Sequence, residues 1–287
     1  MNPFELHEAA VDYQHLQAAE CWHGHRLGLF WQPVLCRSAP YEGYHVEALL
    51  RLQPNAAPTM LDTTELIHRL EARGSTSGLD NWVISSSLDF LARHSDALNG
   101  LRTLSVNVSP CSLNNDDFLD DTLALFRAYP GQSAKLCLEI TEVSRLSNFR
   151  SIQRFLAQSR TLGVKVALDD FGSGYSNFRY VIDLQFDIIK IDGSIVRTIC
   201  HNRASRAVVS SIAKLARDLN CTSVAEWVED TDTLQALLAL DIHGFQGKLV
   251  AMAMEPARFL NARNLNCVLP KGHLDGLLLN PDSRLWA

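Results

Sequence analysis

Eight short apolar runs, rich in β-branched residues, alternate along the chain with longer segments of helical periodicity. This alternation is typical of βα units, in which neighbouring strands form a largely parallel sheet and helices cover it. Strands are expected over residues 29–35, 45–50, 103–108, 135–140, 164–168, 186–191, 222–225 and 243–246. Helices are expected over residues 80–93, 118–129, 149–162, 204–219 and 231–240. The pattern therefore predicts an α/β fold.

The connection between the first two strands constrains the topology further. Only the segment CRSAPYEGY separates them, which is too short for a crossover helix, so the two strands should pair as an antiparallel hairpin. The remaining strands alternate with helices, and eight strands in this arrangement predict a (β/α)8 barrel of the TIM type with a reversed first strand. We expect the barrel over residues 26–265, an N-terminal extension over 1–25 and a C-terminal extension over 266–287.

Composition and charge exclude several classes of protein. With 47% hydrophobic and 20% charged residues, the chain can bury a large core. The net charge is −6 and no run of Lys and Arg occurs, so neither DNA nor RNA polymers are expected as partners. The sequence has no apolar run long enough to span a membrane and no signal-peptide pattern, and its cysteines lack metal-site spacing. We therefore expect a cytoplasmic protein with reduced thiols and no membrane partner.

Polar residues fall inside or at the end of nearly every expected strand. They are Glu47, Asn107, Glu139, Asp169, Asp170, Lys190, Glu226 and Gln246. Any one of them alone is better explained as a helix cap or an ordinary ion pair, but the C-terminal strand ends of a barrel form one face, where all should converge. Buried carboxylates are costly unless they are paired or bound to a cation, and one lysine cannot neutralise five. Oxygen ligands without Cys or His favour Mg²⁺, Mn²⁺ or Ca²⁺, and the adjacent pair Asp169–Asp170 suits two metals.

These residues lie in a series of seven short motifs that resembles a known family. The motifs are Glu47-Ala48-Leu49-Leu50-Arg51, SVNVSP with Asn107, LEITE with Glu139 and Glu142, LDDFGSGYSNF with Asp169 and Asp170, IIKIDGS with Lys190 and Asp192, VAEWVED with Glu226 and Glu229, and GFQG with Gln246. In this order they resemble the EAL domain, the family of cyclic-di-GMP phosphodiesterases, over roughly residues 26–256. The resemblance implies a modified TIM barrel with an antiparallel first strand, in agreement with the hairpin.

The resemblance also implies a role for each residue. One divalent cation would lie on Glu47, Asn107, Glu139 and Asp169, and a second on Asp169, Asp170 and Glu226. The implied catalytic residues are Lys190, Gln246, Glu47 and Glu226, and the positions of Lys190 and Gln246 are those that hold or polarise water in the family. The implied substrate-binding residues are Gln32, Arg51, Asp192 and Gln246. Glu142 and Glu229 would anchor the loop that follows Asp170.

The activity implied by the resemblance is bacterial signalling chemistry, the hydrolysis of cyclic-di-GMP to linear pGpG. Two Mg²⁺ or Mn²⁺ ions would activate water and hold the phosphate oxygens, and Ca²⁺ would inhibit. The family also implies a homodimer.

The chain departs from the family pattern at a few positions. Trp227 stands where the family usually has Gly, and residues 248–254 replace an aromatic residue followed by a Lys/Arg-Pro pair. Leu52 and Ser173 are milder exchanges. Three functions stay open: an active phosphodiesterase, a catalytically silent EAL protein acting as a cyclic-di-GMP receptor or protein-binding regulator, and a phosphodiesterase for another nucleotide. The retained acidic residues favour the active phosphodiesterase. Trp227 favours the silent EAL protein, and the altered segment favours a phosphodiesterase for another nucleotide.

Overall fold

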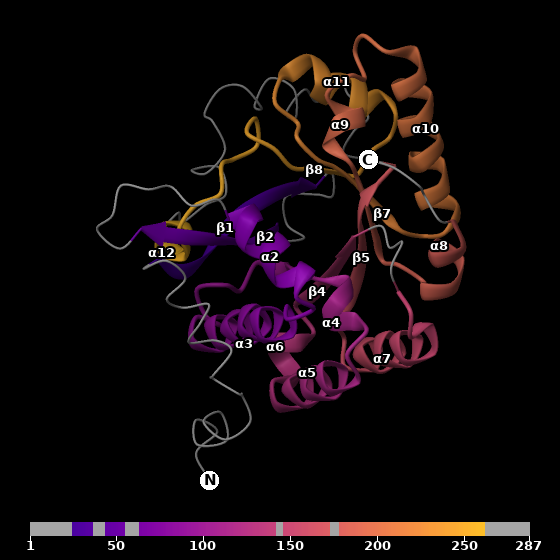
Figure 1. Cartoon of the computed structure of the whole chain (residues 1–287). Coiled ribbons are helices and arrows are strands. Elements are labelled where there is room, and N and C mark those ends of the chain that lie inside the picture. The colour runs from indigo at the N-terminus through magenta and orange to yellow at the C-terminus, as the bar shows by residue number, and fades with distance from the viewer. Residues whose placement is uncertain (1–24, 37–43, 55–62, 142–145, 173–177, 262–287) are drawn as a thin grey trace.

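The eight strands form one closed barrel in chain order (Figure 1). The computed structural model describes residues 25–36, 44–54, 63–141, 146–172 and 178–261. The strands are β1 His25–Cys36, β2 Tyr44–Pro54, β3 Leu101–Val108, β4 Leu136–Thr141, β5 Lys165–Phe171, β6 Ile188–Ile191, β7 Thr222–Ala225 and β8 Gly244–Phe245. Each of the eight expected strands is present, so the predicted barrel is confirmed.

The first strand is reversed, as the short connection after it predicts. β1 runs antiparallel to both of its neighbours, β2 and β8, whereas all the other neighbouring pairs are parallel. The register places Glu47 of β2 beside Gln32 of β1 and Asn107 of β3 beside Glu139 of β4. Polar residues of successive strands are thereby brought to the same level of the barrel.

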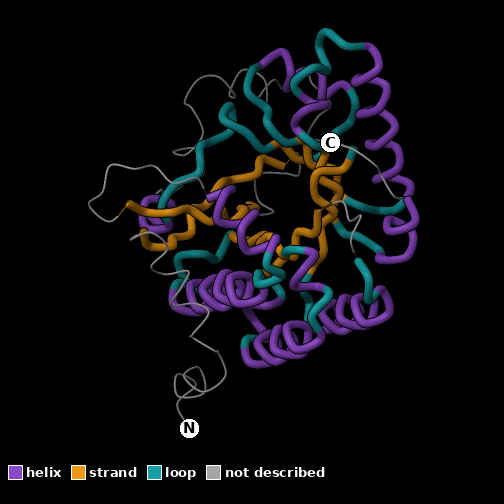
Figure 2. The backbone as a smooth tube through the Cα atoms, viewed as in Figure 1, coloured by secondary structure: helices purple, strands orange, loops and turns teal. Residues whose placement is uncertain are grey.

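Helices lie along the outside of the ring of strands (Figure 2). They are α2 Thr63–Ala72, α3 Ser77–Arg93, α4 Pro110–Leu113, α5 Asp116–Ala128, α6 Pro130–Ser133, α7 Phe149–Thr161, α8 Phe178–Leu184, α9 Gly193–Val196, α10 Arg203–Asp218, α11 Thr231–Ala239 and α12 Pro256–Asn261. The five expected helices correspond to α3, α5, α7, α10 and α11. Polar caps start several of them, and the Asp230 carboxylate, for example, accepts a hydrogen bond of 2.7 Å from Thr233 N at the start of α11.

Apolar side chains from strands and helices form a continuous core between the two layers. Trp31 of β1 is buried, and its ring lies 4.5 Å from that of Phe90 and 5.2 Å from that of Phe259, centroid to centroid. These contacts hold the reversed strand against α3 and α12. Among the helices of the described ranges, none has the length and hydropathy needed to cross a membrane.

Candidate functional site

Lys190 of β6 is at the centre of a carboxylate cluster inside the barrel. Its Nζ lies 2.7 Å from Glu139 Oε2, 2.7 Å from Glu226 Oε1, 3.0 Å from Asp169 Oδ1 and 3.2 Å from Glu47 Oε2. Glu47 comes from β2, Glu139 from β4 and Asp169 from β5, and Glu226 directly follows β7. The expected convergence of strand-end residues is therefore present, with the ammonium as the shared partner of four acids.

Two amides complete the cluster around Glu47. Asn107 Nδ2 donates a hydrogen bond of 2.8 Å to Glu47 Oε1, and Gln246 Nε2 donates one of 2.6 Å to Glu47 Oε2. Gln246 Nε2 also lies 3.4 Å from Gln32 Oε1, and Gln32 Nε2 donates to the Ala251 carbonyl at 3.0 Å. The segment after β8 thus helps to orient the amide that holds Glu47.

The charges in the cluster do not balance, and this is the feature that fits a cation. Glu47, Glu139, Asp169, Asp170 and Glu226 carry five formal negative charges against one on Lys190, which leaves four without a cationic partner in the cluster as far as the described residues go. Buried carboxylates in such excess need further positive charge.

Two acceptor atoms in the cluster are buried without a hydrogen bond, Asp169 Oδ1 and Gln246 Oε1. Asp169 Oδ1 is close to the Lys190 ammonium but the two form an ion pair without hydrogen-bond geometry. Asp169, Asp170 and Glu226 also present ligand atoms that all lie within 4.8 Å of one another. Within the described ranges, this is the single group of three or more such side chains at metal-binding spacing. The donor set therefore fits a hard divalent cation.

Burial and mutual repulsion shift the pKa values of the cluster. Burial, and then the charges of Asp169 and Glu47, raise the pKa of Glu226 to about 8 despite the nearby Lys190. Burial and the Asp169 carboxylate raise the pKa of Asp170 to about 6. Burial disfavours the charged form of Lys190, but the surrounding carboxylates outweigh it and raise its pKa well above the ordinary value. The ammonium is therefore charged across the physiological range.

The pKa values of Glu139 and Glu47, two of the acids that face Lys190, shift in opposite directions. Burial and the neighbouring Glu47 raise the pKa of Glu139 well above its usual range. Burial also acts against the Glu47 anion, but Lys190, Gln246 and Asn107 outweigh it and lower its pKa. The protein therefore stabilises the Glu47 anion through the Lys190 charge and through hydrogen bonds from both amides.

Two residues at the rim adopt left-handed backbone angles. Asp170 has a φ of 53° and Trp227 a φ of 53°, each next to an acid of the cluster. Trp227 takes this angle where the family usually has Gly, and a side chain such as Trp adopts it at a cost. Its indole is 52% exposed, packs against Gly193 and has the Arg197 guanidinium 4.2 Å from the ring centroid. The departure seen in the sequence thus places a large, half-exposed ring beside Glu226.

The other residues assigned by resemblance lie around the cluster. Arg51 is exposed and donates to the Leu50 carbonyl at 2.8 Å. Asp192 caps α9 through Oδ1, which accepts from Ser194 N at 3.0 Å. Glu229 Oε1 pairs with Lys248 Nζ at 3.1 Å. Glu142 and Ser173 lie outside the described residues. The roles of all these residues stay predictions.

One buried network near the site was not predicted from the sequence. Asp80 of α3 accepts a hydrogen bond of 2.9 Å from Ser109 N, two residues after Asn107, and Thr76, Ser109 and Ser112 bond to one another through their hydroxyls. The network fixes the chain where it leaves β3. No motif marks Asp80, because its function is to support backbone from a helix distant in sequence.

The fold and the site together define a class of protein, a TIM-type barrel with a carboxylate-rich site at the C-terminal ends of its strands. The chain matches the EAL domain over residues 14–253 and belongs to this family. It is 34% identical over 177 residues to cyclic di-GMP phosphodiesterase PdeF of Escherichia coli K12, covering 62% of this chain and 24% of PdeF. It is 32% identical over 211 residues to cyclic di-GMP phosphodiesterase PdeA of Borreliella burgdorferi, covering 71% of this chain and 30% of that PdeA. The chain thus spans less than a third of the length of either relative.

Solved structures show the same fold. The PaMucR phosphodiesterase in its c-di-GMP complex is 26% identical, with a TM-score of 0.74, and the match covers 86% of this chain and 99% of that chain. The EAL enzyme Bd1971 in its cAMP- and cyclic-di-GMP-bound form is 26% identical, with a TM-score of 0.75, and the match covers 92% of this chain and 69% of that chain. The modified TIM barrel is therefore shared with these proteins.

Proposed function

We propose that the chain is a metal-dependent phosphodiesterase that hydrolyses cyclic-di-GMP to linear pGpG. The observation that carries this function is the cluster of four carboxylates around Lys190, with Asp170 as a fifth beside Asp169 and Glu226, at the C-terminal end of an EAL barrel. Relatives named cyclic di-GMP phosphodiesterases and a similar structure with bound c-di-GMP support this substrate. A module that only bound another protein would gain nothing from so costly a buried cluster.

The cations we assign are two Mg²⁺ or Mn²⁺ ions. Glu47, Asn107, Glu139 and Asp169 would hold one, and Asp169, Asp170 and Glu226 the other. When bound, such ions make water nucleophilic near neutral pH and neutralise phosphate oxygens. Ca²⁺ would inhibit, because it takes more ligands at longer distances and so misplaces the reacting groups.

The protein's own groups would orient the reactants. Gln246 Oε1 is buried without a partner, so it can accept a hydrogen bond from the attacking water. Lys190 Nζ is fixed by its carboxylate partners and can stabilise negative charge that develops on the phosphate. Arg51 is exposed and can turn toward a substrate phosphate. Asp192 caps α9 with Oδ1, which leaves Oδ2 for the substrate.

The test is incubation of the purified chain with cyclic-di-GMP and Mg²⁺ or Mn²⁺, with EDTA as a control and products resolved by chromatography. We expect metal-dependent pGpG from the natural chain and none from Glu47→Ala. Glu65→Ala, which removes an exposed glutamate of α2, is the matched control and should keep full activity. Normal hydrolysis by Glu47→Ala would show that the assigned site is wrong.

Trp227 favours a second candidate, a catalytically silent EAL protein that acts as a cyclic-di-GMP receptor or protein-binding regulator. Its half-exposed indole lies directly after Glu226 and can obstruct the substrate while every acid stays in place. Binding of cyclic-di-GMP in calorimetry, without product in the assay above, would establish this function instead. A Trp227→Gly variant that gained hydrolysis would identify the indole as the obstruction.

We also propose that the protein acts in the cytoplasm as a homodimer. The described cysteines are unpaired, which supports a reducing compartment. Ile182 belongs to α8, the helix after the loop that follows Asp170. Its apolar side chain is 71% exposed, which supports a contact surface on this helix. Light scattering of the natural chain and of Ile182→Asp should give a dimer and a monomer, respectively. A monomeric natural chain at all concentrations would exclude the homodimer.

A further inference from the structure

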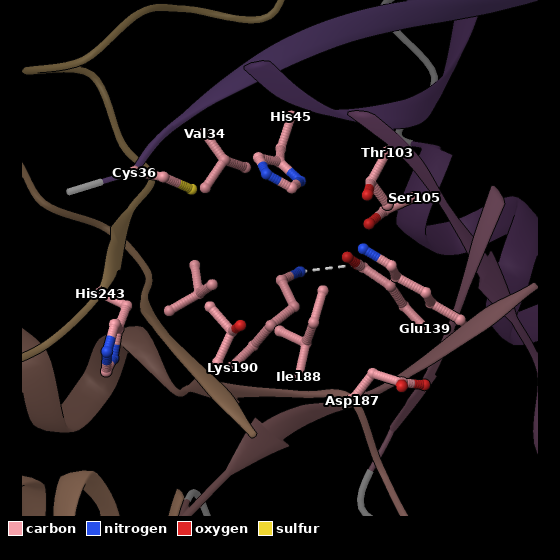
Figure 3. A pocket seen from close by; sticks show the side chains of 13 residues that line it. Val34, Cys36, His45, Thr103, Ser105, Glu139, Asp187, Ile188, Lys190 and His243 are labelled. Carbon is pink, nitrogen blue, oxygen red and sulfur yellow. Dashed lines mark hydrogen bonds and ion pairs between the residues drawn. The ribbon is translucent and has the colours of Figure 1, made fainter. Parts of the chain in front are cut away.

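A cavity of about 420 Å³ lies at the end of the barrel opposite the open face of the acidic cluster. Residues near the starts of parallel strands line it, among them His45 of β2 and Thr103 of β3 (Figure 3). Lys165, the first residue of β5, lines it as well. Glu139 and Lys190 of the acidic cluster also line it (Figure 3). The proposed hydrolysis uses the opposite face, so this space is left without a role.

A buried hydroxyl on the cavity wall has no partner. Thr103 is 1% exposed, and its Oγ1 makes no hydrogen bond. A buried polar group without a partner is costly, so its presence points to a molecule that satisfies it. His45 lies beside Thr103 in the register of β2 and β3, and its ring also lacks a hydrogen bond among the described residues. An imidazole carries at least one N–H in either protonation state, so the His45 ring can donate a hydrogen bond into the cavity that it lines.

The same cavity contains an unpaired positive charge. The ammonium of Lys165 makes no ion pair or hydrogen bond within the described part of the chain, although its field acts on Cys36 and His45. Asp187, a carboxylate on the wall, is already engaged, because its Oδ2 accepts from Val166 N at 2.8 Å and lies 3.9 Å from Arg160 Nε. The wall therefore presents hydrogen-bond donors on Lys165, Thr103 and His45 that have no acceptor among the described residues.

We propose that this cavity is a second ligand site, which binds a small organic anion. Its carboxylate or phosphate oxygens would accept hydrogen bonds from Lys165, Thr103 and His45. Its short apolar body would pack against Val34, Ile188 and Val224, which are the aliphatic side chains of the lining. The site takes its ligand from the end of the barrel away from the cyclic dinucleotide, so it does not depend on the proposed hydrolysis.

The test is calorimetric titration of the full chain in EDTA, in which the acidic cluster repels anions. The probes are butyrate, its uncharged isostere butyramide, and inorganic phosphate as a head group without an apolar body. We expect butyrate to bind at least about tenfold more tightly than butyramide, because hydrogen bonds to a charged group are the stronger kind. Stronger binding of phosphate than of butyrate would assign a phosphate head, and the reverse a carboxylate.

Two variants locate the site. Lys165→Met keeps the alkyl stem and should weaken butyrate binding about tenfold, and Thr103→Val should weaken it several-fold without loss of stability, since the hydroxyl is unpartnered in the free protein. Lys214→Met, which removes an exposed lysine paired with Asp218, is the matched control and should bind normally. Equal binding of butyrate and butyramide, undiminished binding by Lys165→Met, or no binding of any probe would overturn the inference and leave a cavity that holds water only.

Discussion

Replacing Gly193 with alanine should destabilise the barrel because of a single neighbour, Trp227. A methyl group at Gly193 would lie 2.7 Å from Trp227 Cβ and closer still to its Cγ and Cδ1. These atoms form the fixed base of the indole, so they cannot swing aside as the end of a long side chain would. The backbone angle of Gly193 itself is open to any residue, so no backbone strain adds to the steric contact.

The size of the effect follows from two opposing contributions. Overpacking of this kind costs about 1–3 kcal/mol. Alanine in place of glycine stabilises a helix by up to about 1 kcal/mol, and this gain acts in α9 as well. Gly193→Ala should therefore lower the free energy of unfolding by about 1–2 kcal/mol. In a Trp227→Gly background the contact is absent, and the same change should be neutral or stabilising.

Urea denaturation of the four proteins in this double-mutant cycle measures the coupling between the two positions. Gly131→Ala is the matched control, because Gly131 lies in the four-residue helix α6, where an added methyl group would have no neighbouring atom within 4 Å. It should leave stability unchanged or slightly raised. An equal loss of stability from Gly193→Ala in both backgrounds would refute the steric explanation.

Three further predictions concern charge. Lys190→Met leaves the surrounding carboxylates unpaired, so it should lower the free energy of unfolding by about 3–5 kcal/mol at pH 8 and by less at pH 5, where the acids protonate. Equal losses at the two pH values, measured by urea denaturation, would contradict this. Burial raises the pKa of Asp80 to about 6, so the stability it confers is complete below about pH 4, its unfolded value, and is lost as the pH rises through about 6. Asp80→Asn keeps an acceptor for Ser109 N and should stabilise the protein by up to about 3 kcal/mol at pH 8, and a curve of stability against pH parallel to that of the natural chain would disprove this. Mg²⁺ should raise the Tm of the natural chain in calorimetry but not that of Asp169→Asn, and an equal rise in both would place the cation elsewhere.

The periodicity of the sequence was sufficient to predict the barrel, its strand order and its reversed first strand. It also predicted that Glu47, Glu139 and Asp169 converge, because direction along a parallel strand fixes the end at which a residue lies. Helix α2 was missed because Leu66 is its single buried residue, which gives no apolar stripe to recognise. Helices α4, α6 and α9 are four residues long, too short for a helical period.

The finer features of the site depend on contacts that periodicity does not encode. The position of Lys190 among four carboxylates is set by side-chain reach across strands that are distant in sequence. The packing of Trp227 on Gly193 likewise joins two segments whose proximity exists only in the folded barrel. The motifs identified which residues belong to the site, whereas the packing of the folded barrel determines which side chains each of them contacts.

The acidic cluster also has a consequence for how the chain reaches its native state. The hydrogen bond from Gln246 to Glu47 spans 199 residues of sequence, and that from Lys190 to Glu47 spans 143. The first contact needs the segment after β8 to meet β2, and the second needs β6 to lie across the barrel from β2, so we expect Glu47 to join the cluster after most of the barrel has formed. Removing the charge that accepts both hydrogen bonds, as in Glu47→Gln, should then change the unfolding rate and leave the refolding rate nearly unchanged. The repulsion among the carboxylates therefore reaches its full strength late in folding, after most of the strands have paired.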